Sequence, residues 1–277
     1  MSKKNIQLII VDPQNDFCSP NGSLFVTGAD GDMVRLGAMI KRLSKKITDI
    51  HVSLDSHRLV DIAHPIMHVN SNGQHPNPFT IITEEDYNNG TWRCFNPSWQ
   101  NRAKDYLKQL KVNNRYPLCI WPPHCLIAST KKLANGEQFC GHAVSLPVSE
   151  ALLQWEQDNF AVTNYLVKGD NILTEHYSFY QADVPDPSDP STLPNTEFLE
   201  LIRDADEIPF GGEALSHCVA NSMRDVCNAF GEENIKKFVL LKDCCSSVTG
   251  FEKLGQDFIK EMVKKGMQVT TSVEYLS

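Results

Sequence analysis

The chain has 277 residues, a formal net charge of -8 at pH 7 and a hydrophobic share of 41%. This length and composition allow one large α/β domain, or two small ones, with a packed core. The negative charge and the lack of a basic stripe argue against a nucleic-acid partner, because backbone phosphates require clustered Lys and Arg.

Membrane and secretion signals are also missing from the pattern. No apolar stretch approaches the roughly 20 residues that a membrane helix needs, so no membrane partner is expected. The charged start Met1–Lys4 is followed by too short an apolar run for a signal peptide. Nine cysteines, an odd number that includes the adjacent pair Cys244 and Cys245, do not resemble a disulfide framework. We therefore expect a cytoplasmic protein.

The predicted elements alternate between strands and helices along the chain. The strands are expected at 6–11, 48–54, 160–167, 206–210, 237–241 and 267–271. The helices between them are expected at 32–46, 148–158, 217–230 and 251–265. This alternation indicates right-handed crossovers, with helices on both faces of the sheet. We expect residues 1–277 to form a single domain.

Two regions interrupt the alternation. Residues 66–120 are rich in Asn, Pro and aromatic residues, with one credible helix at 99–111. A stretch this long with few strand signals is typical of a functional lid or an inserted subdomain. Residues 181–196 contain four prolines and predict an extended surface linker.

Three polar residues follow strands that are expected to be parallel. Asp12 closes the first strand, Lys168 closes the strand at 160–167, and Cys218 lies where a later strand gives way to a helix. The carboxyl ends of parallel strands line one crevice, so the three side chains could converge. An acid, a lysine and a cysteine together indicate thiol-based hydrolase chemistry. Taken singly, they also fit a polar turn, a surface charge and a buried structural thiol.

Cys218 has two further features that favour a nucleophile. It falls in the first turn of the helix predicted at 217–230, where unpaired amides and the helix dipole favour a thiolate. The preceding Gly211 and Gly212 permit an unusual backbone path. The amides near Ala214 and Cys218 could then point at a developing oxyanion.

A metal site is predicted beside this group. Asp55 and His57, two residues apart at a strand end, project to the same side. Carboxylate oxygen and imidazole nitrogen suit a divalent transition metal. The pair alone would fit an ordinary loop, but His64 and His124 supply two more potential ligands. Five other histidines are expected to be surface or packing residues: His51, His68, His75, His142 and His176.

Five blocks carry a family resemblance, and they punctuate almost the whole chain outside 66–120. They are Val11–Cys18 with Gly22–Leu24, Asp55–His57 with His64–Pro65, Trp121–Cys125, Lys168–Gly169 with Tyr177–Ser178, and Ala214–Val219. In these blocks the chain resembles the isochorismatase-like cysteine hydrolases, and most closely their nicotinamidase/pyrazinamidase branch. The resemblance implies an α/β fold with a six-stranded, mostly parallel sheet and helices on both faces.

The resemblance also implies roles for individual residues. Asp12, Lys168 and Cys218 would be the catalytic triad, and a cis peptide before Ala214 would aim the Ala214 and Cys218 amides as an oxyanion hole. One divalent metal, zinc or alternatively iron or manganese, would be held by Asp55, His57, His64 and His124. The walls of a small aromatic pocket would be Phe17, Leu24, Trp121, Tyr177 and His217.

The activity that the resemblance implies is hydrolysis of nicotinamide to nicotinate and ammonia through a Cys218 thioester, within pyridine nucleotide salvage. The partner would be a small aromatic carboxamide. A related cysteine amidase acting on another carboxamide or a carbamoyl compound is the main alternative. A non-catalytic metal-binding scaffold is disfavoured because no triad residue is missing, and a thiol-free isochorismate hydrolase because Cys218 is present.

Three departures from the family pattern bear on the substrate. Residues 66–120 lengthen the segment between the third and fourth metal ligands, where they could roof the pocket or build a homo-oligomer interface. Glu213 stands before the expected cis bond, where the family usually has an apolar residue. Ala128 and Ser129 stand where relatives often carry glycine. None of these departures touches the triad.

Overall fold

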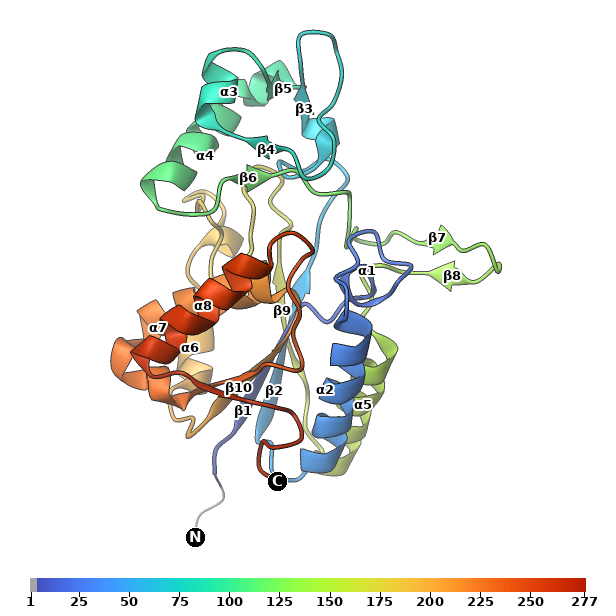
Figure 1. The fold of residues 1–277 in the computed structure, drawn as a ribbon, viewed down its shortest axis with the longest axis vertical. Coiled ribbons are helices and arrows are strands. Elements are labelled where there is room, and N and C mark those ends of the chain that lie inside the picture. The colour runs from blue at the N-terminus through green and yellow to red at the C-terminus, as the bar shows by residue number, and fades with distance from the viewer. Residues whose placement is uncertain (1–3) are drawn as a thin grey trace.

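The computed structural model describes residues 4–277. Their fold is built around one parallel sheet (Figure 1). The strands are β1 (Gln7–Val11), β2 (Asp49–Asp55), β9 (Asn164–Lys168), β10 (Ile208–Gly212), β11 (Phe238–Leu241) and β12 (Gln268–Thr270). They lie in the order β12-β11-β10-β1-β2-β9, and every neighbouring pair is parallel. The expected six-stranded sheet is confirmed, and its central strand β1 is buried at every residue, as a strand covered on both faces should be.

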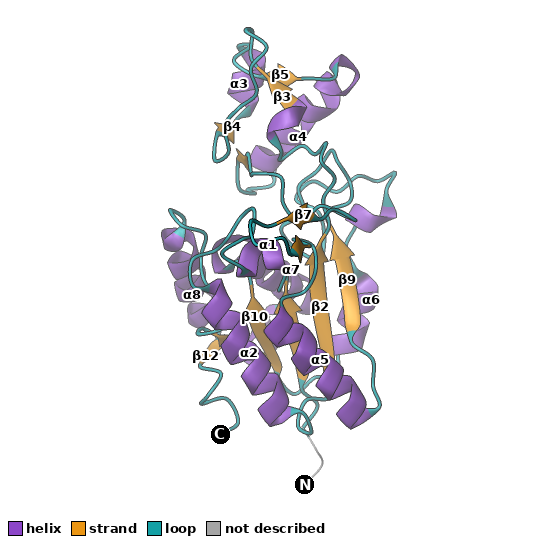
Figure 2. Ribbon diagram, turned by 90° about the vertical axis from the view of Figure 1, so that its right-hand side faces the viewer, coloured by secondary structure: helices purple, strands orange, loops and turns teal. Residues whose placement is uncertain are grey.

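Helices cover both faces of the sheet. One layer holds α2 (Ala29–Leu43) and α5 (Leu146–Asn159), and the other holds α6 (Thr196–Ile202), α7 (Ala220–Phe230) and α8 (Glu252–Lys265) (Figures 1 and 2). The apolar residues of α2 recur at helical spacing, so one side of the helix is buried in the core. Its buried residues include Met33, Leu36, Met39, Ile40 and Leu43. All four helices predicted around the sheet are present, with bounds shifted by a few residues.

Two boundaries differ from the prediction in ways that matter for the site. The strand expected from residue 160 begins only at Asn164, because Phe160 ends α5 in a left-handed conformation with φ 52°. Cys218 does not lie in the first turn of an α-helix. It lies in a π-helical turn, Leu215–Val219, that precedes α7.

Residues 66–120 form a small lobe beyond the carboxyl edge of the sheet (Figures 1 and 2). The lobe contains α3 (Glu84–Asn88) and α4 (Gln100–Val112), the second of which matches the helix predicted at 99–111. Two antiparallel pairs accompany them: β3 (His68–Val69) with β5 (Arg93–Cys94), and β4 (Ile81–Ile82) with β6 (Leu118–Cys119). Strands of two residues have no detectable period in the sequence, so they were not predictable.

Smaller elements complete the chain. These are α1 (Asn15–Cys18), the protruding hairpin β7 (Lys131–Lys132) with β8 (Gln138–Phe139), and 3-10 turns at Pro65–Met67, Pro97–Trp99, Pro190–Thr192 and Glu232–Lys237. The linker predicted at 181–196 does not lie wholly on the surface, because Ala182, Asp183 and Thr192 are buried. Within residues 4–277, no helix has both the length and the apolar character that crossing a membrane requires.

Candidate active site

The structure brings Asp12, Lys168 and Cys218 together at the carboxyl edge of the sheet. Lys168 Nζ lies 3.0 Å from Asp12 Oδ2 and 3.7 Å from Cys218 Sγ. All three residues are buried. Asp12 follows β1 directly and Lys168 ends β9, so parallel strands deliver both groups to the same edge.

The local backbone holds Asp12 in an unusual conformation. Its φ is 43°, in the left-handed region, and its N–H donates to Ser53 Oγ at 3.0 Å. The Ser53 hydroxyl in turn donates to Asp12 Oδ1. Gly212 allows β10 to pass close to this point, because a Cβ there would lie 2.0 Å from Val11 O. The turn carrying Cys218 can therefore approach Asp12.

Burial controls the protonation of the nucleophile. It raises the pKa of the Cys218 thiol well above its usual value, and Lys168 opposes this rise only in part. Burial also raises the pKa of Asp12, again against the effect of Lys168. Loss of hydration therefore outweighs the effect of Lys168 and favours the thiol form of Cys218, so the sulfur needs a neighbouring base to take its proton.

Lys168 connects this group to the predicted metal ligands. Burial lowers the pKa of Lys168, but Asp12 and Asp55 raise it by more, so that it lies well above its ordinary value. Lys168 Nζ is 2.8 Å from Asp55 Oδ1. A single permanent cation is thus shared between the carboxylates of the two clusters.

Three of the four predicted metal ligands converge, and the fourth, His64, lies beside them. One ligand atom from each of Asp55, His57 and His124 lies within 4.8 Å of the others. Asp55 Oδ2 is 3.0 Å from His57 Nε2 and 3.4 Å from His124 Nε2. The ring of His64 is adjacent, with its centroid 5.2 Å from that of His57 and 5.7 Å from that of His124. Burial lowers the pKa of His64 to about 4, so its imidazole is neutral.

The hydrogen bonds of the three histidines fit a metal ion. The Nδ1 atom of each faces an oxygen: Asp61 Oδ2 at 3.0 Å for His57, Arg58 O at 3.1 Å for His64, and Pro122 O at 2.9 Å for His124. With the Nδ1–H of each ring bonded to one of these oxygens, Nε2 is the atom that would bind a cation. Burial lowers the pKa of His57, but Asp55 and Asp61 raise it by more, to well above its usual value, so binding a metal would displace the proton on its Nε2. His64 Nε2 is buried without a hydrogen-bond partner among residues 4–277. Three such nitrogens and a carboxylate suit a divalent transition metal.

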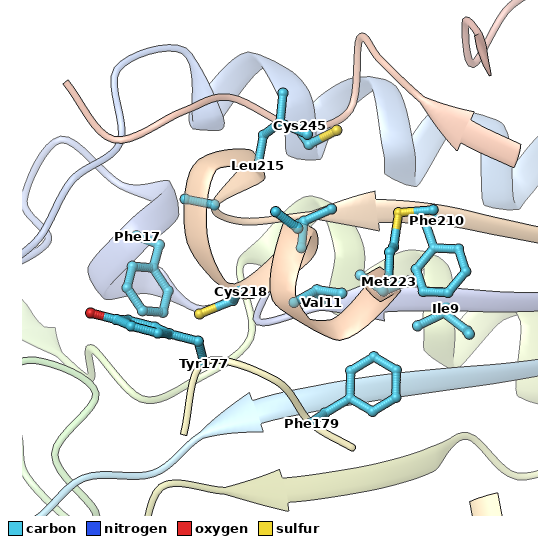
Figure 3. Close-up of a cluster of buried hydrophobic side chains, with 14 of the residues drawn as sticks. Ile9, Val11, Phe17, Tyr177, Phe179, Phe210, Leu215, Cys218, Met223 and Cys245 are labelled. Atoms are coloured by element: carbon cyan, nitrogen blue, oxygen red, sulfur yellow. The ribbon is translucent and has the colours of Figure 1, made fainter. Parts of the chain in front are cut away.

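An aromatic cavity lies between the two clusters. All five predicted pocket residues line it, together with Asp55, His124, Glu175, Ala214, Cys218 and Val248. Phe17 and Tyr177 lie beside the Cys218 sulfur (Figure 3). Trp121 donates its indole N–H to Tyr177 Oη at 3.0 Å, and the His217 ring packs against both. Burial lowers the pKa of His217 to about 3, which keeps this wall uncharged.

The turn before Cys218 has the expected backbone. The Glu213–Ala214 peptide is cis, and Ala214 lines the cavity. Within the described part of the chain the Ala214 N–H makes no hydrogen bond, whereas the neighbouring Leu215 N–H donates to Ser246 O. Ala214 therefore has an amide available for a ligand in the cavity.

Glu213, an exception to the family pattern, faces away from the pocket. Its side chain is fully buried, and Oε2 accepts a hydrogen bond from Ser246 N at 3.1 Å. Burial, and after it Asp32, raises the pKa of Glu213 well above its usual value. It does not line the cavity. Glu213 is therefore a buried packing residue whose surroundings favour the protonated form.

Several supporting residues were not predicted from sequence. Gln14 holds Asp55 through two hydrogen bonds, from Nε2 to Asp55 O at 2.8 Å and from Asp55 N to Oε1 at 2.7 Å. Asp16 accepts from Cys125 N at 2.6 Å and so fixes the segment that carries His124. Gln14 and Asp16 belong to the Asp12–Phe17 block, which was a usable signal. Asp61 and Glu175 had none.

The lobe contributes to the same site from above. Tyr116, near its end, packs edge-on against His217 with ring centroids 5.6 Å apart. Its hydroxyl accepts a hydrogen bond from Arg224 at 3.1 Å. The insertion therefore supports a wall of the pocket without supplying any predicted catalytic group.

Comparison with known proteins identifies the fold. No family model matches the sequence, and no curated protein matches it. A yeast nicotinamidase structure has a TM-score of 0.64 at 17% identity, covering 96% of this chain and 99% of that chain. A nicotinamidase/pyrazinamidase from Acinetobacter baumanii has a TM-score of 0.63 at 18% identity, covering 99% and 100%. A Pyrococcus horikoshii pyrazinamidase in complex with zinc has a TM-score of 0.55 at 16% identity, covering 96% and 99%. The chain therefore has the fold of the nicotinamidases and pyrazinamidases.

Proposed function

We propose that this protein is a metal-dependent cysteine amidohydrolase that converts nicotinamide to nicotinate and ammonia. The observation that carries the proposal is the buried group of Asp12, Lys168 and Cys218, which lies beside an aromatic cavity and an Asp–His cluster. Solved structures with this fold include a yeast nicotinamidase bound to the inhibitor nicotinaldehyde and a Leishmania infantum protein in complex with nicotinate.

In the first half of the reaction, the raised pKa values of Cys218 and Asp12 suit a transfer of the thiol proton from one residue to the other. Asp12 takes the thiol proton as Cys218 Sγ attacks the carboxamide carbon, and Lys168 stabilises the negative charge that passes between them. The Ala214 and Cys218 amides stabilise the oxyanion, and each such donor is typically worth about 3–4 kcal/mol. Asp12 then gives the proton to the leaving nitrogen. The C–N bond breaks, ammonia departs, and a thioester remains on Cys218.

The second half restores the enzyme. Asp12, again a carboxylate, removes a proton from a water molecule that attacks the thioester carbon. The C–S bond breaks, the thiolate takes back the proton from Asp12, and the nicotinic acid that forms leaves and gives up its proton to solvent as nicotinate. The net reaction consumes one water and releases one ammonia, so the residues end as they began.

A divalent cation would be held by Asp55, His57, His64 and His124. When bound, it supplies a Lewis acid at the cavity wall, suited to a pyridine nitrogen or to a water molecule. The zinc in the Pyrococcus horikoshii structure supports zinc here, with iron and manganese as alternatives. Elemental analysis of the purified protein distinguishes the three.

A second amide substrate is the alternative that the lobe favours. Because Tyr116 packs against His217, the insertion can change the pocket that a compact relative would have. In either case the product would be a carboxylate and ammonia.

With nicotinamide, the product would feed pyridine nucleotide salvage. The nine cysteines, all unpaired, support the expected reducing cytoplasm.

The test is ammonia release from nicotinamide, pyrazinamide and benzamide by metal-replete protein, with Cys218→Ala as control. Release from nicotinamide that Cys218→Ala abolishes supports the proposal. Release from another amide alone keeps the chemistry and rejects the substrate. No release from any of the three, with metal content verified, rejects the amidohydrolase proposal for aromatic carboxamides.

A further inference from the structure

Glu175 is a buried carboxylate that the proposed mechanism leaves unused. Only 4% of the residue is exposed. Oε1 accepts a hydrogen bond from His176 N at 2.9 Å, whereas Oε2 is buried and has no partner within residues 4–277. Buried carboxylate oxygens are nearly always hydrogen-bonded or paired. Because Glu175 also lines the catalytic cavity, this free oxygen is available to a partner that is not part of the protein.

The position of Glu175 narrows the choice of partner. It lines the catalytic cavity together with Asp55 and His124. Burial raises the pKa of its carboxyl, and the charges that affect this pKa most belong to His57, Asp61 and Asp55, in that order. Asp55 and His57 are predicted metal ligands, and Asp61 is hydrogen-bonded to His57. Glu175 therefore shares the cavity wall with two predicted metal ligands, Asp55 and His124.

The backbone of Glu175 is anchored from two directions. Its N–H donates to Tyr106 Oη at 3.3 Å, which ties it to α4 of the lobe. Its carbonyl accepts from Asp183 N at 2.9 Å. Within the described residues the side chain makes no ion pair with Lys or Arg. Its place in the cavity is thus fixed by the backbone, and its free oxygen is left for a ligand.

We propose that Glu175 is a fifth residue of the metal site, whose free oxygen accepts a hydrogen bond from a water molecule held by the cation. Asp55 and the three histidines would supply the protein ligands of the cation, and water would complete its coordination shell. A further carboxylate beside them acts on water that occupies or enters the coordination shell. The inference rests on the metal site of the proposed function and does not depend on which amide is hydrolysed.

The experiment titrates metal-free, full-length protein with zinc against a chromophoric chelator. Glu175→Gln should raise the Kd for zinc about 10–100-fold, the usual effect of losing such a partner. Glu175→Ala, which removes both oxygens, should lose at least as much affinity. The matched control is Asp183→Asn: Asp183 is similarly buried and neither carboxyl oxygen has a hydrogen-bond partner within residues 4–277, although Arg115 Nε lies 3.9 Å from Oδ1, and Asp183 does not line this cavity. Its Kd for zinc should equal that of the unaltered protein.

Three results would overturn the inference. Unchanged zinc affinity in both Glu175 variants would show that the carboxylate does not serve the metal. A raised KM with unchanged zinc affinity would assign Glu175 to the substrate. An equal loss of zinc affinity in Asp183→Asn would indicate general disruption of the segment. Failure of the unaltered protein to bind zinc would be a separate outcome, refuting the metal site itself and with it this role for Glu175.

Discussion

The carboxyl edge of the sheet and the lobe at 66–120 are both packed into the hydrophobic core, yet they differ in what they bury. The edge buries Lys168 within ion-pair distance of two buried carboxylates, those of Asp12 and Asp55. The buried residues of the lobe are mainly apolar or aromatic, such as Tyr106 and Leu110, and its charged residues are largely exposed. Burial alone does not mark a functional site. Buried charges held together against their hydration cost do.

The two regions also differ in the range of their contacts. At the edge, Asp12 bonds to Ser53 and Lys168 to Asp55, partners that are 41 and 113 residues apart in sequence. In the lobe, α3 is capped by its own Thr83 and Asp86, three residues apart. Substitutions should therefore remove chemistry at the edge and only local stability in the lobe.

The largest effect is expected for Cys218→Ala. Removing the sulfur eliminates the acyl carrier, so turnover should fall by about 10⁴-fold or more, the scale seen when a catalytic nucleophile is lost. Ammonia release measures this, and circular dichroism and zinc content should stay unchanged. Appreciable residual rate in the variant would refute a thioester mechanism.

A second test removes metal ligands. His57→Ala and His124→Ala should each strip zinc from the purified protein, because both rings place Nε2 near Asp55. Elemental analysis of the protein gives the result. His75→Ala in the lobe is the matched control, since this exposed histidine lies outside the cluster and should leave zinc content intact. Full zinc occupancy in His57→Ala would show that the ligand assignment is wrong.

A smaller effect is expected on the pH dependence of the free energy of unfolding, through the buried carboxyl of Asp183. Burial raises the pKa of Asp183 to about 8, although Arg115 opposes the shift. The folded protein then holds a proton that the unfolded chain releases near pH 4. The stabilisation is full below that pH and is lost as pH rises through about 8.

Asp183→Asn should remove this dependence on pH. The free energy of unfolding of the variant, relative to the unaltered protein, should rise between pH 5 and 8, by at most about 1.4 kcal/mol per pH unit. Urea unfolding of the metal-free proteins at several pH values measures the difference. If the free energy of unfolding changes with pH in the same way for both proteins, Asp183 does not titrate in this range.

The smallest effect is expected within the lobe. Thr83→Ala removes the hydroxyl that caps α3 and should cost about 1 kcal/mol of stability. Ammonia release and zinc content should not change, because Thr83 lies outside the cavity and the metal cluster. A clear loss of turnover in this variant would mean that the lobe takes a direct part in catalysis.

Much of this architecture could be predicted from local patterns. Apolar runs such as Gln7–Val11 and the helical spacing in α2 specify the sheet and its layers, because each pattern suits one kind of buried surface. Asp12 and Lys168 could be placed at one edge because parallel strands all end there. The lobe was visible only as an interruption, since strands of two residues carry no periodic signal.

The parallel sheet and the polar residues at its carboxyl edge could be predicted from the sequence, because the hydrophobic period and the alternation of strands with helices are visible along the chain. The burial of Cys218 in a π-helical turn, which raises the pKa of its thiol, depends on distant segments that come together only in the tertiary structure. The same holds for the hydrogen bond between Asp61 and His57 and for the unpartnered oxygen of Glu175, a residue that lines the cavity. These features are set by neighbours that only folding brings together, and no spacing along the chain encodes them.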